Sequence, residues 1–365
     1  MRRIRTTMLQ PGMKTARNIY ADDGTILLGA GMALTEYFIY RLDELGIASV
    51  YIQDDVFNSL GEIPDVIPEE VRIRTVQEVK ETFHALESSR SINVYKVKDA
   101  VENILDELLA NHDILVNLSD MRSYDNYTYY HSVNVCVLSL LTGITLGFNH
   151  PDLKELGIGA LMHDIGKTQI DKEVLNKSGQ LSPAEYREIQ QHAVYGYQIL
   201  RSYDDIPLLS AHIALQHHEH WDGQGYPRNL KGDEIHRYAR IVAVTDVYDA
   251  LLSDRPYRTA YSVNQAITIL GRMAKTHFES RSLTAFVSNI AIYPIGSVVS
   301  LNTGETGMVV DGNYETPTRP IVRVMFDRHQ RKLTPPHEVD LSTFRTIYIA
   351  RVLSEKDISR LKNSN

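Results

Sequence analysis

Histidine and aspartate residues gather in one part of this 365-residue chain with a spacing that suits metal binding. Nine of the 14 histidines lie between positions 131 and 236, less than a third of the sequence. His163 and Asp164 stand together at the end of an apolar stretch that begins at Leu156. Burying an imidazole and a carboxylate in apolar surroundings costs free energy unless both are satisfied, and a transition metal would satisfy both. Lys167 follows one helical turn later, where it could contact a phosphate oxygen.

A second histidine pair precedes a glycine-rich segment. His217 and His218 are adjacent, so their side chains leave the backbone in different directions and could bind different metal ions. Residues 222–227 read Asp-Gly-Gln-Gly-Tyr-Pro. Two glycines and a proline favour an irregular, closely packed loop of the kind found at the rim of a pocket. His220, between the pair and the loop, fits a supporting or surface position.

Three single residues extend the candidate set. His131 lies in a tyrosine-rich stretch, His192 has a glycine one turn later, and Asp246 sits in an apolar run. Taken singly, each is better explained as a core residue that is hydrogen-bonded to a local partner. Their occurrence together favours a metal centre. Cys136, the only cysteine, lies in an apolar stretch and is expected to be inert core.

The elements that must hold these residues predict a mainly α protein of several domains, as a chain of this length requires. We expect residues 1–60 to form a small α+β domain and residues 61–122 a linker and helical region. Residues 123–290 are expected to form an all-helical catalytic domain. Residues 291–365 are expected to form a small β-barrel with a tail. The helices between residues 69 and 114 could form a homodimer contact or pack on the catalytic domain.

Local signals support this division. Asp23-Gly24 predicts a hairpin turn, and Thr35 opens a helical pattern. Ser182 predicts a helix start, because proline follows it and Glu185 can close a capping box. β-Branched runs separated by turn sequences predict the strands of the barrel. These runs are Val298 to Leu301, Gly307 to Val310, Ile321 to Phe326 and Arg345 to Val352.

Composition excludes some classes of partner. The net charge of -8 gives no overall basic field for duplex nucleic acid, although local charges could still bind a small anion. The basic start, residues 2–5, lacks the apolar continuation of a signal peptide and is expected to be a solvated terminus. The most apolar stretch, Val133 to Phe148, is too short and polar for a transmembrane segment. With a single cysteine, the chain is expected to be cytoplasmic.

The order of these residues resembles the HD-GYP subfamily of the HD phosphohydrolases. The resemblance covers about residues 123–285 and includes the Gly-Tyr-Pro sequence, which ends at Pro227, that gives the subfamily its name. It implies a role in bacterial second-messenger signalling, as a phosphodiesterase that hydrolyses cyclic di-GMP (c-di-GMP). The product would be linear pGpG, and a further step to GMP stays open.

The resemblance also implies the roles of single residues. Two divalent transition metals, iron or manganese, would be held with Asp164 bridging them, by His163, Asp164, His192, His217, His218 and Asp246. His131 corresponds to a ligand of members with a third metal, which carry Glu one turn earlier. Tyr127 stands there in this chain, which favours two metals and leaves His131 open. His163, Asp164 and Lys167 would serve catalysis. The implied substrate contacts are Lys167, Tyr226, Arg255 and Arg258.

Other interpretations of the same residues remain. An HD hydrolase for another nucleotide, such as a cyclic GMP-AMP or an alarmone, would have the same metal site. A receptor that binds c-di-GMP with little turnover, or a signalling module that contacts GGDEF-domain proteins, would fit the multidomain organisation. A helical protein with purely structural histidines would make the order of the motifs a coincidence.

Overall fold

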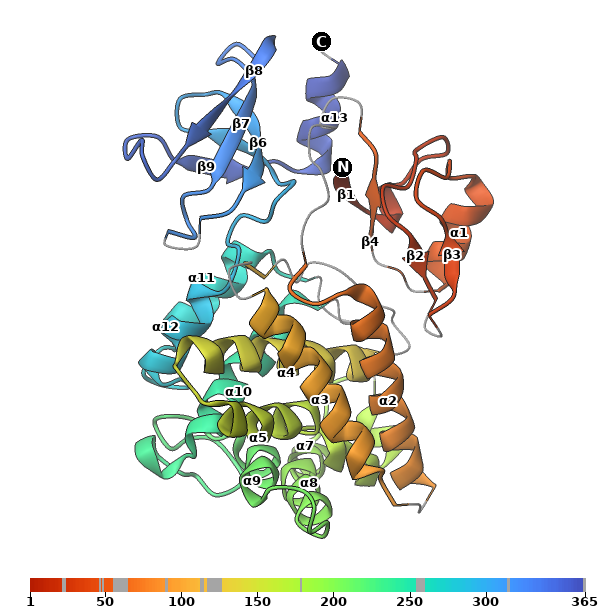
Figure 1. Cartoon of the computed structure of the whole chain (residues 1–365), viewed down its shortest axis with the longest axis vertical. Helices are drawn as coiled ribbons and strands as arrows, with labels where there is room; N and C mark the ends of the chain where they lie inside the picture. Colours follow the sequence, from red (N-terminus) through yellow and green to blue (C-terminus); the bar gives the residue numbers. More distant parts are fainter. Residues whose placement is uncertain are drawn as a thin grey trace. The chain divides into compact units, whose positions relative to one another are not determined.

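The computed structural model of the chain describes residues 1–21, 24–45, 47, 49–54, 65–88, 91–111, 115–116, 127–177, 179–253, 260–313 and 316–363. The chain divides into two compact units. One comprises Met1–Asp65, Asp113–Tyr127 and Ile290–Asn365, and the other comprises Val66–His112 and Thr128–Asn289. The second unit is helical (Figure 1). It contains the candidate site residues described below.

The helical unit is built from a buried central helix and the helices around it. Its longer elements are α2 (Glu69–Glu87), α3 (Val94–Ala110), α4 (Tyr127–Thr145), α5 (His150–Leu161), α7 (Pro183–Gln190), α8 (His192–Leu200), α9 (Leu208–Gln216), α10 (Arg237–Leu252), α11 (Val263–Met273) and α12 (Ser280–Ser288). Short elements are the 3-10 helices η2 (Ile165–Gln169) and η3 (Gly232–Glu234) and the helix α6 (Lys172–Leu175). Residues 133–141 of α4 are all buried, as expected of a helix that is apolar on every side.

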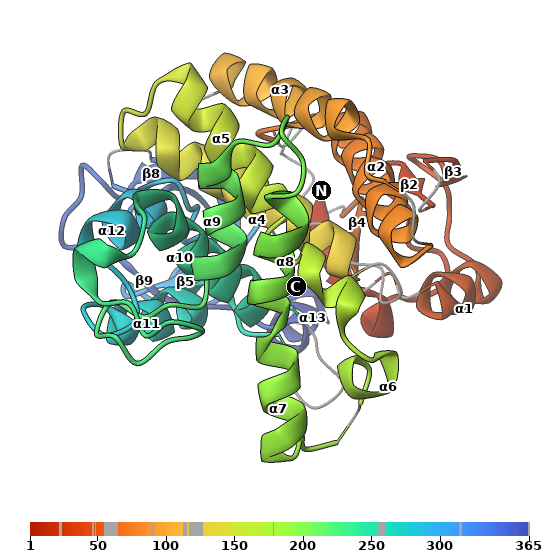
Figure 2. The ribbon, with the colours of Figure 1, turned by 90° about the horizontal axis from the view of Figure 1, so that it is seen from below.

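Two glycines bring α5 close to its neighbours. A Cβ atom at Gly157 would lie 2.5 Å from Val101 of α3, and one at Gly159 would lie 2.8 Å from the carbonyl oxygen of Ser210 in α9. Larger residues would therefore push these helices apart. The close approach fixes the C-terminal end of α5, where His163 and Asp164 follow. In the same unit α9 lies beside α8 (Figure 2). Helix α8 also contacts η2.

Helix starts follow the capping signals in the sequence. Ser182 accepts a hydrogen bond from the backbone N–H of Glu185, and the Glu185 carboxylate accepts one from the N–H of Ser182, so the capping box that opens α7 is confirmed. Asn149 caps α5 through the N–H of Asp152. Among the described residues, no helix combines the length and the apolar character that crossing a bilayer requires.

The described N-terminal residues form two short strand pairs and one helix. β1 (Arg2–Arg5) pairs with β4 (Ser49–Ile52), and β2 (Ile19–Tyr20) pairs with β3 (Ile26–Leu28), both antiparallel. Helix α1 (Glu36–Glu44) is capped by Thr35, as its sequence predicted. The predicted hairpin joins β2 and β3, although Asp23 lies outside the described residues. The expected solvated terminus is wrong, because residues 2–5 form β1.

The C-terminal residues form an open antiparallel sheet, so the predicted closed barrel is wrong. Its strands are β5 (Val298–Leu301), β6 (Thr306–Asp311), β7 (Ile321–Phe326), β8 (Lys332–Asp340) and β9 (Ile349–Val352), in the order β8-β7-β6-β5-β9. Within the described residues, β8 and β9 are the edges and do not pair with each other.

The sheet has two apolar faces, which explains why it stays open. One face carries Val299, Val309 and Val322 in a core of its own. The other face carries Val298 and Met308, packed with residues of the helix α13 (Glu355–Asn363) and its approach. Because a helix covers the second face, the sheet need not close on itself to bury it.

Candidate metal centre

Histidine and aspartate side chains from five parts of the helical unit meet around one buried carboxylate. Asp164 lies at the start of η2, and its Oδ1 atom is 3.5 Å from Nε2 of His192 and 3.9 Å from Nε2 of His217. Its Oδ2 atom is 3.4 Å from Nε2 of His163 and 3.8 Å from Nε2 of His131. Each carboxylate oxygen therefore faces a different pair of imidazoles.

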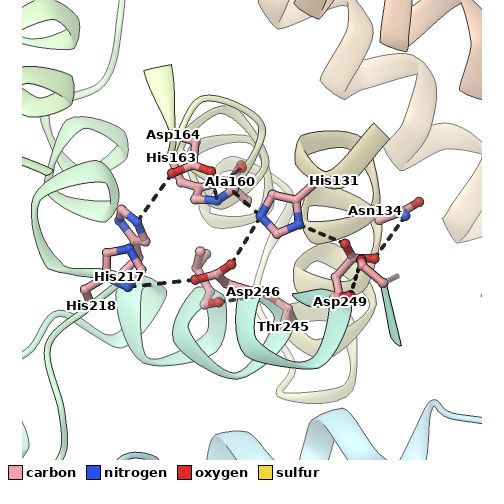
Figure 3. Close-up of polar contacts among 12 residues, drawn as sticks. His131, Asn134, Ala160, His163, Asp164, His217, His218, Thr245, Asp246 and Asp249 are labelled. Carbon is pink, nitrogen blue, oxygen red and sulfur yellow. Dashed lines mark hydrogen bonds and ion pairs between the residues drawn. The ribbon is translucent and has the colours of Figure 1, made fainter. Parts of the chain in front are cut away.

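A second carboxylate lies beside the same cluster. Asp246 of α10 places Oδ1 3.2 Å from Nε2 of His131 and Oδ2 3.9 Å from Nδ1 of His218 (Figure 3). Ligand atoms of His192, His217 and His218 lie within 4.8 Å of one another, and so do those of His131, His163 and Asp164. The structure thus brings together all seven residues that the sequence suggested as ligands.

Backbone carbonyls orient three of the imidazoles. The Nδ1–H group of His163 donates to the carbonyl of Ala160 at 2.8 Å, that of His192 to Ile189 at 2.6 Å, and that of His217 to Ala214 at 2.9 Å. A carbonyl can only accept, so Nδ1 carries the proton in each neutral ring. The Nε2 lone pairs consequently point into the cluster, which is the orientation of a metal-binding histidine.

Without a cation these lone pairs would be unsatisfied. Nε2 of His163 is buried and has no hydrogen-bond partner. Nε2 of His192 lies 3.3 Å from Nε2 of His217, although both rings already donate from Nδ1. Two facing lone pairs repel each other, and buried polar atoms without partners are rare. The donor set of imidazoles and carboxylates therefore fits a transition metal.

The protonation states agree with this donor set. Burial lowers the pKa of His192, holds that of His217 well below its ordinary value, and lowers that of His218 to about 3. Burial alone would raise the pKa of Asp164, yet Lys167 and His163 hold it well below its usual range. At neutral pH these three imidazoles are therefore neutral and Asp164 is ionised, the forms in which such groups bind metals.

Lys167 closes one side of the centre. Its Nζ atom forms an ion pair and a hydrogen bond with Oδ2 of Asp164, three residues earlier in η2. The side chain is 29% exposed, so it can also face a ligand in solution. Gly166 lets this segment reach α8, because a Cβ atom there would lie 1.9 Å from the carbonyl oxygen of His192. The segment is a 3-10 helix and not a continuation of α5, and it holds Asp164 against His192.

The Gly-Tyr-Pro loop lies against the histidine pair. The ring of Tyr226 stacks on that of His218, with centroids 4.7 Å apart and planes at 29°. A Cβ atom at Gly225 would lie 2.4 Å from the carbonyl oxygen of His218, so only glycine allows this approach. Tyr226 therefore lies beside the cluster, and its role as a substrate contact stays a prediction. Arg255 and Arg258 lie outside the described residues.

Sequence reasoning missed two carboxylates near the centre. Glu219 is buried and accepts hydrogen bonds from the backbone N–H groups of Arg228 and Leu230, which fixes the end of the loop. Asp249 is buried and accepts a hydrogen bond from His131. Its position three residues after Asp246, on the same helical face, is a signal that could have identified it.

Two residues lie where the sequence suggested. The ring of His220 packs against that of His277, with centroids 4.1 Å apart, which agrees with a supporting position. Cys136 is fully buried in α4, and burial raises the pKa of its thiol. A buried thiol with a raised pKa is a poor nucleophile, so the chemistry of the centre does not involve it.

Two family models match this chain, one within its helical part and one over its C-terminal sheet. Residues 103–281 match the family model of the HD domain, and residues 298–361 match that of the KOW domain associated with the HD domain. The cyclic di-GMP phosphodiesterase PA4108 of Pseudomonas aeruginosa is 34% identical over 261 residues, which are 71% of this chain and 62% of that protein. The 3'3'-cGAMP-specific phosphodiesterase 3 of Vibrio cholerae is 38% identical over 168 residues, 46% of this chain and 36% of that protein.

This chain spans less than two thirds of the length of either relative. Among solved structures, Bd1817 of Bdellovibrio bacteriovorus, described as an HDG"Y"P protein, aligns with a TM-score of 0.52. The alignment covers 78% of this chain and 97% of that protein at 19% identity. At this identity the likeness concerns the fold.

Proposed function

This chain belongs to the HD domain family, with a Gly-Tyr-Pro loop of the HD-GYP type, and from that premise we propose that it hydrolyses a cyclic dinucleotide at a metal centre. The observation that carries the proposal is the set of inward-facing imidazole lone pairs around Asp164. These lone pairs need a cation, and beside them the partly exposed Lys167 ammonium and the Tyr226 side chain could contact an anion.

The proposed centre would hold two divalent metals, iron or manganese. Its ligands are His163, Asp164, His192, His217, His218 and Asp246. Asp164 would help to hold both metals, because its two oxygens face different pairs of imidazoles. When bound, a metal pair of this kind activates water and stabilises charge on a phosphate during in-line displacement. Imidazole and carboxylate ligands suit both iron and manganese.

The residues beside the metals would bind and orient the substrate. The Lys167 ammonium lies next to Asp164 and can pair with a nonbridging phosphate oxygen, which offsets charge that builds up in the transition state. Tyr226 offers a hydroxyl and an aromatic face at the rim. Burial raises its pKa, so the hydroxyl stays protonated and can donate to a phosphate. Arg255 and Arg258 are proposed as further phosphate contacts from the sequence alone.

We propose c-di-GMP as the substrate and linear pGpG as the first product. The relatives include proteins named for c-di-GMP and for 3'3'-cGAMP, so the second dinucleotide is the alternative substrate. Both molecules have the same pair of phosphodiester bonds. Their discrimination depends on the base pocket, and the metal centre serves either one.

A substrate panel tests the proposal. Protein purified without oxygen is incubated with c-di-GMP or 3'3'-cGAMP, and the products are separated by chromatography. We expect pGpG from c-di-GMP, with GMP later if the second bond is also cut. The Asp164→Asn variant, which keeps the size of the side chain, should form neither product. Binding of c-di-GMP without turnover by the metal-loaded protein would instead indicate a receptor.

A further inference from the structure

A line of buried polar side chains connects α2 with the metal centre. The Nη1 atom of Arg72 donates to Oδ1 of Asn134 at 3.2 Å, and Nδ2 of Asn134 donates to Oδ1 of Asp249 at 3.0 Å. Oδ2 of Asp249 is 2.8 Å from Nδ1 of His131. Figure 3 shows the last two links, from Asn134 through Asp249 to His131. All four residues are less than 5% exposed, so the line is shielded from water.

The chemistry of Arg72 sets the direction of each hydrogen bond. A guanidinium only donates, so the oxygen of Asn134 must face Arg72 and its NH2 group must face Asp249. A carboxylate at position 249 accepts from Asn134 with one oxygen and from His131 with the other. Nδ1 of His131 therefore carries a proton. Nε2 faces Asp246, 3.2 Å away, and Asp164, and in the neutral ring it offers its lone pair to a metal.

His131 differs in this respect from the other imidazoles of the centre. His163, His192 and His217 donate from Nδ1 to carbonyls of their own helical segments. Among the described imidazoles of the cluster, His131 alone donates from Nδ1 to a carboxylate. A carboxylate partner increases the basicity of the ring and strengthens its bond to a metal. Such support would compensate for the missing glutamate ligand, because Tyr127 stands one turn before His131 at the position where members with a third metal carry Glu.

We propose that Arg72, Asn134 and Asp249 are positioning residues that fix the tautomer of His131 and make it a metal ligand. The inference rests on the proposed metal centre and deepens it. It also explains a buried arginine, since a buried charge is stabilised when hydrogen bonds link it to a group of opposite charge. Helix α2 thereby becomes part of the support of the centre, although its sequence carries no catalytic motif.

Exchanging the polar groups within the line tests the proposal. In Asp249→Asn, the new amide could turn its NH2 group toward the NH2 group of Asn134, which would place two donors face to face. It could instead turn its NH2 group toward Nδ1 of His131, which would move the ring proton to Nε2. In Asn134→Asp, two carboxylates face each other. In the double variant Asn134→Asp/Asp249→Asn, a donor again faces an acceptor in every hydrogen bond of the line. Its carboxylate at position 134 accepts from Arg72 and from the new amide at position 249, and the oxygen of that amide accepts from His131. All three variants preserve size, and the double variant preserves charge.

Metal affinity and the His131 tautomer are the readouts. We expect each single variant to bind the weakest metal equivalent about 10- to 100-fold less tightly, the usual loss when the hydrogen-bond partner of a metal ligand is removed. The double variant should lie within about threefold of wild type, well inside that range. Two-bond proton–nitrogen spectra of histidine-labelled, metal-free protein should show the proton on Nδ1 in wild type and the double variant.

The outcomes separate this inference from the proposed function. Wild-type protein that binds no metal would overturn the metal centre, and the spectra would still test the tautomer. Metal-binding wild type with unchanged affinity in Asp249→Asn would overturn the positioning role alone. A double variant that recovers neither fold nor metal would also overturn it. Arg72→Met should weaken binding as the single variants do, whereas Arg74→Met, on an exposed side chain of the same helix, should not.

Discussion

At the scale of single residues, the centre depends on histidines that stay neutral when buried. His192, His217 and His218 are packed against one another, and burial keeps their pKa values below 6.5. Protonating any of them would add positive charge without hydration and remove a lone pair from the centre. The stability of the metal-free protein should therefore depend on pH in a defined direction.

We expect the metal-free protein to lose stability as the pH falls below about 6.5, the ordinary pKa of histidine. The folded pKa values are lower, so the unfolded chain binds more protons between pH 6.5 and about 3, the pKa of His218. The contribution of these neutral histidines to the free energy of unfolding is complete above pH 6.5, and it is lost as the pH falls from about 6.5 to about 3. The depressed pKa of Asp164 acts only below about pH 4, the ordinary pKa of aspartate.

Urea unfolding of the metal-free protein at about pH 7.5 and pH 5.5, on either side of the ordinary histidine pKa, measures this effect. The midpoint should be lower at the acidic pH, and the difference should shrink in His218→Ala. Equal midpoints at the two pH values in the wild type would contradict the account of buried neutral histidines.

The sequence allowed the ligand candidates to be identified, but the residues that support them could not be found. His163-Asp164 and His217-His218 are dense local signals, and a shared motif order gave them roles. Arg72 and Asn134 have no such signal, and Asp249 has only its position one helical turn after Asp246. Their hydrogen bonds join residues 62 and 115 positions apart, so only the folded arrangement of α2, α4 and α10 reveals them.

At the scale of elements, close helix contacts determine whether the ligands meet. Gly166 lets η2 touch α8, and Gly196 of α8 lies opposite, with its Cβ position 3.4 Å from the N atom of Gly166. A Cβ atom at Gly196 would also lie 3.2 Å from that of Ala214, so the glycine that follows His192 by one turn allows close packing here. The 3-10 turn itself could not be predicted, because the contact that favours it involves α8, whose position is set by tertiary packing.

We expect Gly166→Ala to abolish metal binding. Its Cβ atom would lie 1.9 Å from the carbonyl oxygen of His192 and 2.4 Å from the N atom of Gly196. Because both of these atoms belong to the backbone of α8, η2 must move away from that helix. The shift should separate Asp164 from His192 and cost about 1–3 kcal/mol of stability, as overpacking commonly does. Gly271→Ala is the control, because its Cβ atom meets nothing within 4 Å. Metal content and unfolding midpoints measure both, and full metal content in Gly166→Ala would contradict this role.

At the scale of the whole molecule, the centre lies within one of two units that have separate cores. The candidate ligands all belong to residues 128–289, while the C-terminal sheet has its own apolar clusters. The sequence predicted the strands of that sheet, but the barrel was wrong. Consecutive apolar residues such as Val298-Val299 indicated two buried faces, yet the covering helix α13 has few apolar residues of its own. Contacts with GGDEF domains and homodimer formation stay predictions.

We expect Leu301→Ala to destabilise the sheet without affecting the metal centre. Leu301 is buried in the valine-rich core of the sheet, and such a truncation typically costs about 2–5 kcal/mol. Calorimetry should show earlier unfolding of the sheet, while metal content and turnover stay unchanged below that temperature. Val352→Ala on the exposed side of β9 should change neither. Loss of metal from Leu301→Ala at a temperature where the sheet is still folded would refute the separation of the two units.

The central claim is that neutral imidazoles and carboxylates around Asp164 hold the metals that hydrolyse the substrate. Counting iron and manganese per chain by elemental analysis, in wild type and in His163→Ala purified without oxygen, tests it most directly. We predict about two metal ions per wild-type chain, as a two-metal site requires, and fewer in the variant, whose circular dichroism stays that of the folded protein. A folded wild type without metal, or a variant with undiminished metal content, would contradict the account.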